Sequence, residues 1–144
     1  ARVRAMLHLA RVAPGETLYD LGAGDGRIII TAAREFGAKA VGIEIDPLRS
    51  ALCRWRIRLG GLSDRVRVER ANFFDVDLRD AHVVTFYLSQ AAADRLKAKF
   101  EAELRPGARV VSHRRPVPGW RPAAVDEDHG LYLYIMGESP AADS

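Results

Sequence analysis

The spacing of apolar residues along the chain switches several times between a period typical of helices and one typical of strands. Apolar residues that recur every third or fourth position indicate helices, whereas short alternating or continuous apolar runs indicate strands. The pattern predicts helices over residues 3–12, 27–37, 48–60 and 90–104. It predicts strands over residues 17–21, 40–45, 65–71, 82–88, 108–113 and 131–136.

Residues with strong positional preferences mark the ends of these helices. Asp46 stands directly before Pro47, so we expect Asp46 to cap the third helix and the proline to occupy its first turn. Gly37 is expected to close the second helix. Residues 114–122 are predicted to form a proline-rich loop, and residues 137–144 are predicted to form a loose tail.

The alternation of strands and helices indicates the fold class. Strands that alternate with helices form parallel sheets with helices on both faces, so the pattern predicts a doubly wound α/β fold. The segment 82–88 is almost continuously apolar, as expected for a central strand that is buried on both faces. In such folds ligands bind at the carboxyl ends of the strands, where we expect the functional residues to converge.

Composition and charge narrow the function classes. A chain of 144 residues fits one domain, and it contains no apolar run long enough to span a membrane. Cys53 is the only cysteine and the four histidines are scattered, so the sequence predicts no internal disulfide and no metal site, and it agrees with a reducing, cytoplasmic location. The net charge of +3 is too small and too dispersed to indicate nucleic-acid binding.

The run YDLGAGDGRI follows the first predicted strand and contains three closely spaced glycines. Glycine-rich turns of this kind bind nucleotides. However, the spacing of Gly22, Gly24 and Gly26 is one residue shorter than that of the dinucleotide pattern G-x-G-x-x-G. The same turn contains Asp20 and Asp25, and two carboxylates would repel a pyrophosphate. S-adenosylmethionine carries an ammonium, a sulfonium and a carboxylate but no phosphate, so the loop favours this cofactor over NAD.

The residues of this turn have separate expected roles. Asp20 ends the strand and is expected to attract the ammonium group, while the N-terminus of the following helix takes the ligand carboxylate. Asp25 is expected either to contact the ligand or to cap the turn through hydrogen bonds to its own backbone. The backbone expected to approach the cofactor closely is that of Gly22, Ala23, Gly24 and Gly26.

Two further segments complete the expected nucleotide site. Glu44, at the end of the second predicted strand, is expected to accept hydrogen bonds from ribose hydroxyls, and Ile45 is expected to lie against the adenine ring or to belong to the core. After the third predicted strand, Asn72 offers a donor and acceptors for the adenine edge, with Phe73 packed beside it. The alternative is that residues 72–75 form only a turn with a buried phenylalanine.

These motifs together resemble those of a known family. The runs that carry the resemblance lie within residues 5–122 and are LYDLGAGDGRIII, AVGIEIDP, GLSDRVRVERANFFD, HVVTFYLS and LRPGARVVSH. The chain resembles the class I, seven-strand S-adenosylmethionine-dependent methyltransferases. More narrowly, it is similar to the small archaeal and bacterial protein-lysine methyltransferases, whose mitochondrial relatives modify the ATP synthase c-subunit and the adenine nucleotide translocase.

The resemblance implies a fold, a cofactor and a set of contacts. It implies a Rossmann-like seven-strand sheet in the order 3-2-1-4-5-7-6 with strand 7 antiparallel, which binds S-adenosylmethionine and releases S-adenosylhomocysteine. Relatives more often carry Gly-Asp where this chain has Ala71-Asn72, and they carry a Tyr- and Pro-containing lid ahead of the first helix. We therefore expect one domain over residues 1–144 that either lacks this lid or was cut after it. The implied cofactor contacts come from Asp20, Gly22 to Gly26, Glu44, Asn72 and Phe73.

The residues expected to border the transferred methyl group follow the fourth and fifth strands. The sequence Tyr87-Leu88-Ser89 does not spell the Asn-Pro-Pro-Tyr clamp that methyltransferases use on adenine or glutamine amides. Tyr87 is the candidate catalytic residue, expected to line the acceptor channel or contact the methionine part, with ordinary packing as the alternative. His113 is expected to hydrogen-bond within its loop, with general-base catalysis as the alternative. The arginines that follow it either recruit an acidic partner or form a solvated basic loop.

The sequence therefore predicts an S-adenosylmethionine-dependent methyltransferase, with lysine in a protein substrate as the favoured acceptor. Two alternatives stay open: a methyltransferase for a small molecule or RNA, and a module that binds the cofactor without catalysis. An NAD oxidoreductase is disfavoured by the glycine spacing and by both aspartates of the loop.

Overall fold

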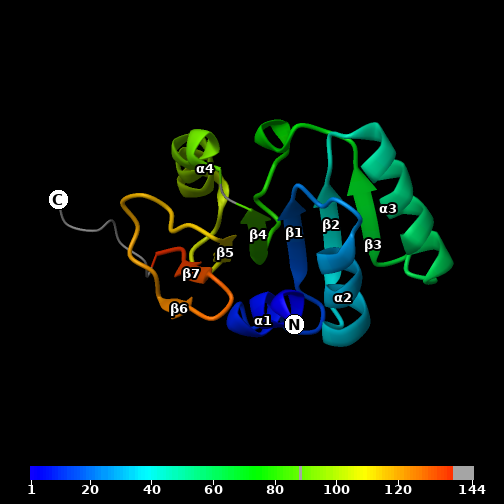
Figure 1. The fold of residues 1–144 in the computed structure, drawn as a ribbon, viewed down its shortest axis with the longest axis horizontal. Helices are drawn as coiled ribbons and strands as arrows, with labels where there is room; N and C mark the ends of the chain where they lie inside the picture. Colours follow the sequence, from blue (N-terminus) through cyan, green and yellow to red (C-terminus); the bar gives the residue numbers. More distant parts are fainter. Residues whose placement is uncertain (88, 138–144) are drawn as a thin grey trace.

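The computed structural model describes residues 1–87 and 89–137 and shows a seven-stranded sheet (Figure 1). The strands are β1 (Thr17–Leu21), β2 (Lys39–Ile43), β3 (Val66–Glu69), β4 (Val83–Tyr87), β5 (Arg109–His113), β6 (Ala124–Asp126) and β7 (Leu131–Ile135). Their spatial order is β3-β2-β1-β4-β5-β7-β6, and β7 runs antiparallel to both of its neighbours. The predicted α/β fold class and the strand order are confirmed.

Helices cover both faces of this sheet. They are α1 (Arg2–Leu9), α2 (Arg27–Phe36), α3 (Pro47–Leu59) and α4 (Gln90–Glu103), together with the short 3-10 helix η1 (Phe73–Asp75). On one face α1, α2 and α3 pack in a core cluster that includes Leu7, Ile29 and Ile57. On the other face α4 and η1 pack around Phe86 and Phe100. No helix among the described residues is long and apolar enough to cross a membrane.

The helices and strands expected from the apolar pattern are present, with ends that differ by up to three residues. The first helix ends at Leu9 rather than at residue 12, because the chain turns at Arg11, whose φ is 53°. The pattern did not predict β6, because a three-residue strand is too short to show alternation, and its pairing with β7 holds it in place. Leu88 and the predicted tail from residue 138 onward lie outside the described residues.

Local capping sets the turns at both ends of β2. Gly37 closes α2 with a φ of 70°, as its position in the sequence predicted. Asp46 Oδ1 accepts hydrogen bonds from the backbone N–H groups of Leu48 at 2.8 Å and Arg49 at 3.3 Å, which confirms Asp46 as the N-cap of α3. The exit from α2 and the entry to α3 therefore depend on residues whose side chains or backbone freedom suit those positions.

The proline-rich loop over residues 114–122 contributes to the core. Its backbone is tied to the sheet by Val117, whose N–H donates to Tyr134 Oη at 2.7 Å. Trp120 is buried, and its ring centroid lies 5.4 Å from that of Tyr134 and 6.2 Å from that of Phe100. The loop is thus anchored over the face of the sheet that α4 covers.

The register of the parallel strands brings four strand ends to the same edge of the sheet. Leu21 at the end of β1 pairs with Ile43 of β2 and with Phe86 of β4. Tyr87 at the end of β4 pairs with His113 of β5. The predicted convergence of the sequence motifs at the carboxyl edge of the sheet is therefore confirmed.

The loop between β1 and α2 ends at Gly26, which is the N-cap of α2 and has a φ of 84°. A Cβ atom at this position would lie 2.6 Å from Sγ of Cys53 in α3. Cys53 is fully buried and belongs to the core cluster on this face of the sheet. The positive φ and the close approach of α3 both require glycine here.

We expect Gly26→Ala to lower the free energy of unfolding by roughly 2–4 kcal/mol, because a steric clash adds to the cost of the positive φ. Gly107→Ala is the matched control, since Gly107 has a φ of 87° but no atom within 4 Å of its Cβ position. That control should cost only about 1–2 kcal/mol. Urea unfolding measures both values, and equal costs for the two variants would contradict the steric role of Cys53.

Candidate functional site

Two cavities open at the carboxyl edge of the sheet and share Gly22 in their walls. The first cavity, of about 360 Å³, is lined by the loop after β1 together with the ends of β4 and β5 and with α1. The second cavity, of about 400 Å³, is lined by residues that follow β2 and β3, including η1. Because Gly22 lines both, one elongated ligand can bridge them across the glycine loop.

Asp20 is a buried carboxylate in the wall of the first cavity. It is only 2% exposed, and its Oδ1 accepts one hydrogen bond from Thr85 Oγ1 at 2.9 Å. Burial raises the pKa of Asp20 to about 7; the Thr85 hydrogen bond opposes this shift, and the charge of Glu44 adds to it. A poorly solvated carboxylate of this kind is stabilised by a cation in the adjoining cavity. The structure places Asp20 where the sequence predicted, and its contact with an ammonium group stays a prediction.

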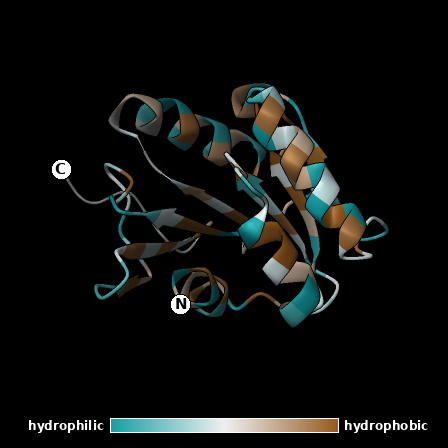
Figure 2. Ribbon diagram, turned by 45° about the vertical axis from the view of Figure 1, so that its right-hand side comes forward, coloured by the Kyte–Doolittle hydropathy of each residue, from teal (hydrophilic) through white to brown (hydrophobic). Residues whose placement is uncertain are grey.

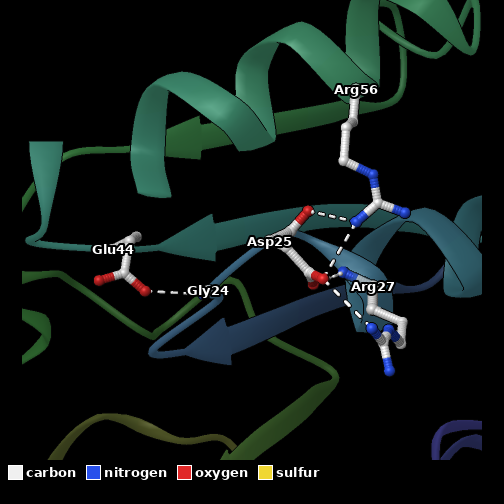
Figure 3. A network of polar contacts seen from close by, with 5 residues as sticks. All are labelled: Gly24, Asp25, Arg27, Glu44 and Arg56. Atoms are coloured by element: carbon white, nitrogen blue, oxygen red, sulfur yellow. Dashed lines mark hydrogen bonds and ion pairs between the residues drawn. The ribbon is translucent and has the colours of Figure 1, made fainter. Parts of the chain in front are cut away.

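Asp25 holds the glycine loop against the neighbouring helices (Figure 3). Its Oδ1 accepts from the backbone N–H of Arg27 at 3.1 Å, and its Oδ2 lies 3.3 Å from the guanidinium groups of both Arg27 and Arg56. Arg56 also donates to the backbone oxygen of Asp25 at 2.9 Å. The capping role that the sequence offered as one alternative is therefore present in the structure, while a contact with the cofactor stays a prediction.

Glu44 ties the end of β2 to the same loop. Its Oε1 accepts from the backbone N–H of Gly24 at 2.7 Å (Figure 3). Its Oε2 accepts from the backbone N–H of Asp46 at 3.1 Å. The side chain is buried yet lines the second cavity. Each carboxylate oxygen can accept another hydrogen bond, so the predicted role with ribose hydroxyls is compatible with these two backbone contacts.

The remaining predicted nucleotide contacts gather around the second cavity. Ile45 is 62% exposed, which excludes the alternative that it belongs to the core, and it lines the cavity together with Asn72 and Phe73. Asn72 Oδ1 accepts from the backbone N–H of Phe74 at 3.0 Å and so caps η1. That bond leaves the amide NH₂ group of Asn72 to donate elsewhere, and its use on an adenine edge stays a prediction.

Tyr87 and His113 form an aromatic rim at the first cavity. Tyr87 is half-exposed, and its ring centroid lies 5.1 Å from that of His113 in an edge-on arrangement. The guanidinium of Arg114 lies 5.6 Å from the Tyr87 ring centroid. The catalytic role of Tyr87 and the alternative of ordinary packing at a strand end both stay predictions.

His113 is engaged by a residue that sequence reasoning missed. Arg2 Nη1 lies 3.0 Å from His113 Nε2, and because arginine only donates, this ring nitrogen accepts. Burial, together with the charges of Arg2 and Arg114, holds the pKa of His113 below its usual range. The hydrogen-bond partner of the His113 side chain is therefore Arg2 of α1, at the rim of the first cavity. No signal in the sequence links a residue of the first helix to the end of the fifth strand.

Comparison with known proteins gives this site a family context. A family model described as the ANTKMT methyltransferase domain matches residues 20–124. A protein-lysine N-methyltransferase of Saccharolobus islandicus is 45% identical over 143 residues, which are 94% of this chain and 89% of that protein. The adenine nucleotide translocase lysine N-methyltransferase of Mus musculus is 42% identical over 147 residues, but this chain spans only 63% of its length.

Solved structures show the same architecture. An RNA methyltransferase of Salinibacter ruber in complex with S-adenosyl-L-homocysteine superposes with a TM-score of 0.91 at 39% identity, covering 98% of this chain and 94% of that one. An S-adenosylmethionine-dependent methyltransferase of Thiobacillus denitrificans superposes with a TM-score of 0.70 at 21% identity, covering 88% of this chain and 52% of that one, and shares the fold alone.

We expect Asp20→Asn to stabilise the ligand-free protein at about pH 8 while it weakens the binding of S-adenosylhomocysteine. The raised pKa of Asp20 means that folding buries a carboxylate at a cost above about pH 7, so its contribution to stability falls as pH rises from about 4 to about 7. Asparagine removes this cost, which should raise the free energy of unfolding by roughly 1 kcal/mol or more. Thermal unfolding of both forms measures the difference, which should shrink toward about pH 4.

The same pKa predicts how ligand binding depends on pH. Calorimetry of the unmodified protein should show S-adenosylhomocysteine affinity that is constant above about pH 7 and falls by up to about tenfold per pH unit below it. In Asp20→Asn that dependence should be lost. A flat affinity profile in the unmodified protein would contradict an ammonium contact at Asp20.

We expect Glu44→Ala to weaken S-adenosylhomocysteine binding by roughly tenfold or more, because it removes two charge-assisted backbone contacts and the predicted ribose acceptor. Glu69→Ala is the matched control, since Glu69 lies on the adjacent β3 and its carboxylate pairs with Arg67 at the surface. Calorimetry should show an unchanged affinity for the control. Unchanged affinity in both variants would refute the assignment of the second cavity to the nucleoside.

Proposed function

The chain belongs to the family of the ANTKMT methyltransferase domain, and from that premise we propose that it transfers the methyl group of S-adenosylmethionine to a lysine side chain of a protein. The observation that carries the proposal is the pair of cavities that adjoin at Gly22, with the buried carboxylate of Asp20 in one and Glu44 in the other. The relatives from Saccharolobus islandicus and mouse, which are named as lysine methyltransferases, support the choice of acceptor.

The two cavities fit the two halves of the cofactor, which supplies a methyl group activated on a sulfonium. The first would take the methionine part, with the ammonium at Asp20 and the carboxylate near the N-terminus of α2, where the backbone N–H groups point outward. The second would take adenosine, with Glu44 on the ribose and Ile45 and Phe73 beside the base. The site of methyl transfer then lies in the first cavity, which Tyr87 and His113 border.

The acceptor amine must be uncharged to attack the methyl group, and the cationic rim of the first cavity favours that state. Arg2, Arg27 and Arg114 line this cavity, so their positive charges lower the pKa of an approaching lysine. Removal of water at the mouth lowers it further. The half-exposed ring of Tyr87 supplies an apolar wall for the methylene chain of the lysine.

An RNA acceptor is the second candidate. The Salinibacter ruber relative is named an RNA methyltransferase, and the same rim arginines would attract phosphates. Against it, the sequence that follows β4 lacks the Asn-Pro-Pro-Tyr clamp, and protein lysine is the acceptor in the name of the relative at 45% identity.

The proposal includes two further expectations, about the extent of the domain and about the cellular setting. The domain is taken as one unit over residues 1–144, because all seven strands of the described residues form one sheet and the helices pack against it. A reducing, cytoplasmic setting agrees with Cys53, the one cysteine of the chain, which is a free and buried thiol.

The test is incubation of the protein and a cell lysate with S-adenosylmethionine that carries a labelled methyl group. We expect label in macromolecules that protease removes and ribonuclease does not, and amino-acid analysis should recover it as methyl-lysine. Asp20→Ala is the control and should abolish the transfer. Label that ribonuclease removes would instead assign an RNA acceptor, label only in small molecules would assign a small-molecule one, and cofactor binding without any transfer would identify a binding module.

A further inference from the structure

The outward face of α3 is a continuous apolar row. Leu48, Leu52, Trp55 and Leu59 are spaced by four, three and four residues, which places them on one side of a helix, and each is between 44% and 82% exposed. We call these four residues the α3 stripe. Single exposed apolar residues are ordinary, but a row of four large ones along a helix indicates a surface that binds something.

The α3 stripe lies opposite the side of α3 that packs on the sheet. The buried residues of the helix are Ser50, Cys53 and Ile57, which at 100° per residue face away from the stripe. Figure 2, in which α3 comes forward, shows apolar and polar residues interspersed along the ribbon of this helix. The helix therefore has two apolar faces, and only one of them contributes to the core.

The borders of the α3 stripe are basic. Helical spacing puts Arg49 and Arg56 along one border and Arg54 and Arg58 along the other. Arg56 is paired with Asp25, while among the described residues the side chains of the other three form no ion pair. The chain has 22 Lys and Arg against 19 Asp and Glu, and α3 holds four of the former and none of the latter. The helix α3 therefore carries a local excess of positive charge.

This charge pattern decides between possible occupants. A second copy of the chain, with α3 against α3, would set arginines against arginines along both borders with no carboxylate from either helix, so self-association is disfavoured. Leucine and tryptophan on one side with arginines on both flanks is the composition of helices that lie in the boundary between lipid headgroups and acyl chains. There tryptophan and leucine enter the apolar layer, and arginines reach phosphates on either side of the helix.

We infer that α3 docks the protein on an anionic lipid surface, with the α3 stripe inserted at the headgroup boundary and Arg54 and Arg58 on lipid phosphates. The four residues of the α3 stripe line neither cavity, and the inference holds whether or not the acceptor is lysine. Ile45, which is 62% exposed and lines the second cavity, stands immediately before α3. Docking would therefore bring the mouth of that cavity next to the lipid surface.

The test is flotation of the purified protein with vesicles of phosphatidylcholine alone and of phosphatidylcholine with an equal share of phosphatidylglycerol. We expect binding to the anionic vesicles that weakens as salt is added, and at least about tenfold weaker binding to the neutral ones. Trp120 is buried and Trp55 is exposed, so a blue shift of tryptophan emission on binding would report the entry of Trp55 into the apolar layer.

Matched variants separate the α3 stripe from other surfaces. Leu52→Ser should weaken vesicle binding, whereas Val125→Ser on β6 should not, although the two residues are 44% and 46% exposed. The triple change of Leu52, Trp55 and Leu59 to serine should reduce binding by about tenfold or more.

The charge contribution has its own control. Arg54→Gln with Arg58→Gln should reduce the preference for anionic vesicles by about tenfold or more, whereas Arg11→Gln with Arg121→Gln, which removes the same charge from exposed positions elsewhere, should preserve it. Unchanged calorimetric affinity for S-adenosylhomocysteine in every variant shows that the fold is intact.

Failure to bind anionic vesicles at low salt, or binding that the α3 stripe variants leave unchanged, would overturn the inference. A dimer in solution that the triple variant dissociates, or an acidic helical peptide that binds the α3 stripe in place of vesicles, would also overturn it.

Discussion

The glycine loop after β1 is held in place by side chains from two other elements, and both cavities depend on this restraint. The carboxylate of Glu44, at the end of β2, accepts a hydrogen bond from the backbone N–H of Gly24. Arg56 of α3 donates to the backbone oxygen of Asp25 and forms an ion pair with its side chain. A loop of alternating glycines has high conformational entropy when it is free, so fixed contacts of this kind are needed to keep a binding surface in shape. Since Gly22 lines both cavities, displacement of the loop would alter both at once.

The buried carboxylate of Asp20 lowers the stability of the ligand-free protein and favours the binding of a cation. A carboxylate that is almost fully buried with a single hydroxyl donor is unfavourable in the empty protein, which is why its pKa rises to about 7. The same desolvation strengthens its attraction for a cation that enters the cavity. An unfavourable group of this type is common at functional sites and is offset by packing elsewhere, and residues 83–86 of the neighbouring strand β4 are all buried.

Much of the fold and of the site could be predicted from the sequence, because local chemistry determines those parts. The cap at Asp46, the apolar run of β4 and the acidic glycine loop each carry their signal within a few consecutive residues. Other features depend on contacts between distant segments: the pairing of Arg56 with Asp25, the contact of Arg2 with His113, and the antiparallel pairing that holds β6. Nothing within any one of these segments identifies its partner.

The helix α3 illustrates a further limit. Its sequence contains two apolar rows, and periodicity alone does not say which of them faces the sheet. The row that packs inward is the smaller one, built from Ser50, Cys53 and Ile57, and Cys53 lies so close to the glycine loop that a Cβ atom at Gly26 would be 2.6 Å from its Sγ. The larger leucine and tryptophan row consequently remains outside.

The distribution of charge inside the first cavity also explains why this loop suits an amino-acid ligand better than a dinucleotide. Asp20 presents negative charge at the buried wall, while the N-terminus of α2 and the guanidinium of Arg27 present positive charge at the same cavity. A zwitterionic amino acid matches both poles, with its ammonium toward Asp20 and its carboxylate toward α2. A pyrophosphate would match only the second pole and would have to lie beside the carboxylate of Asp20, where repulsion in a poorly solvated site is strong. If the ligand binds in this proposed orientation, the same two poles also select its chemical class.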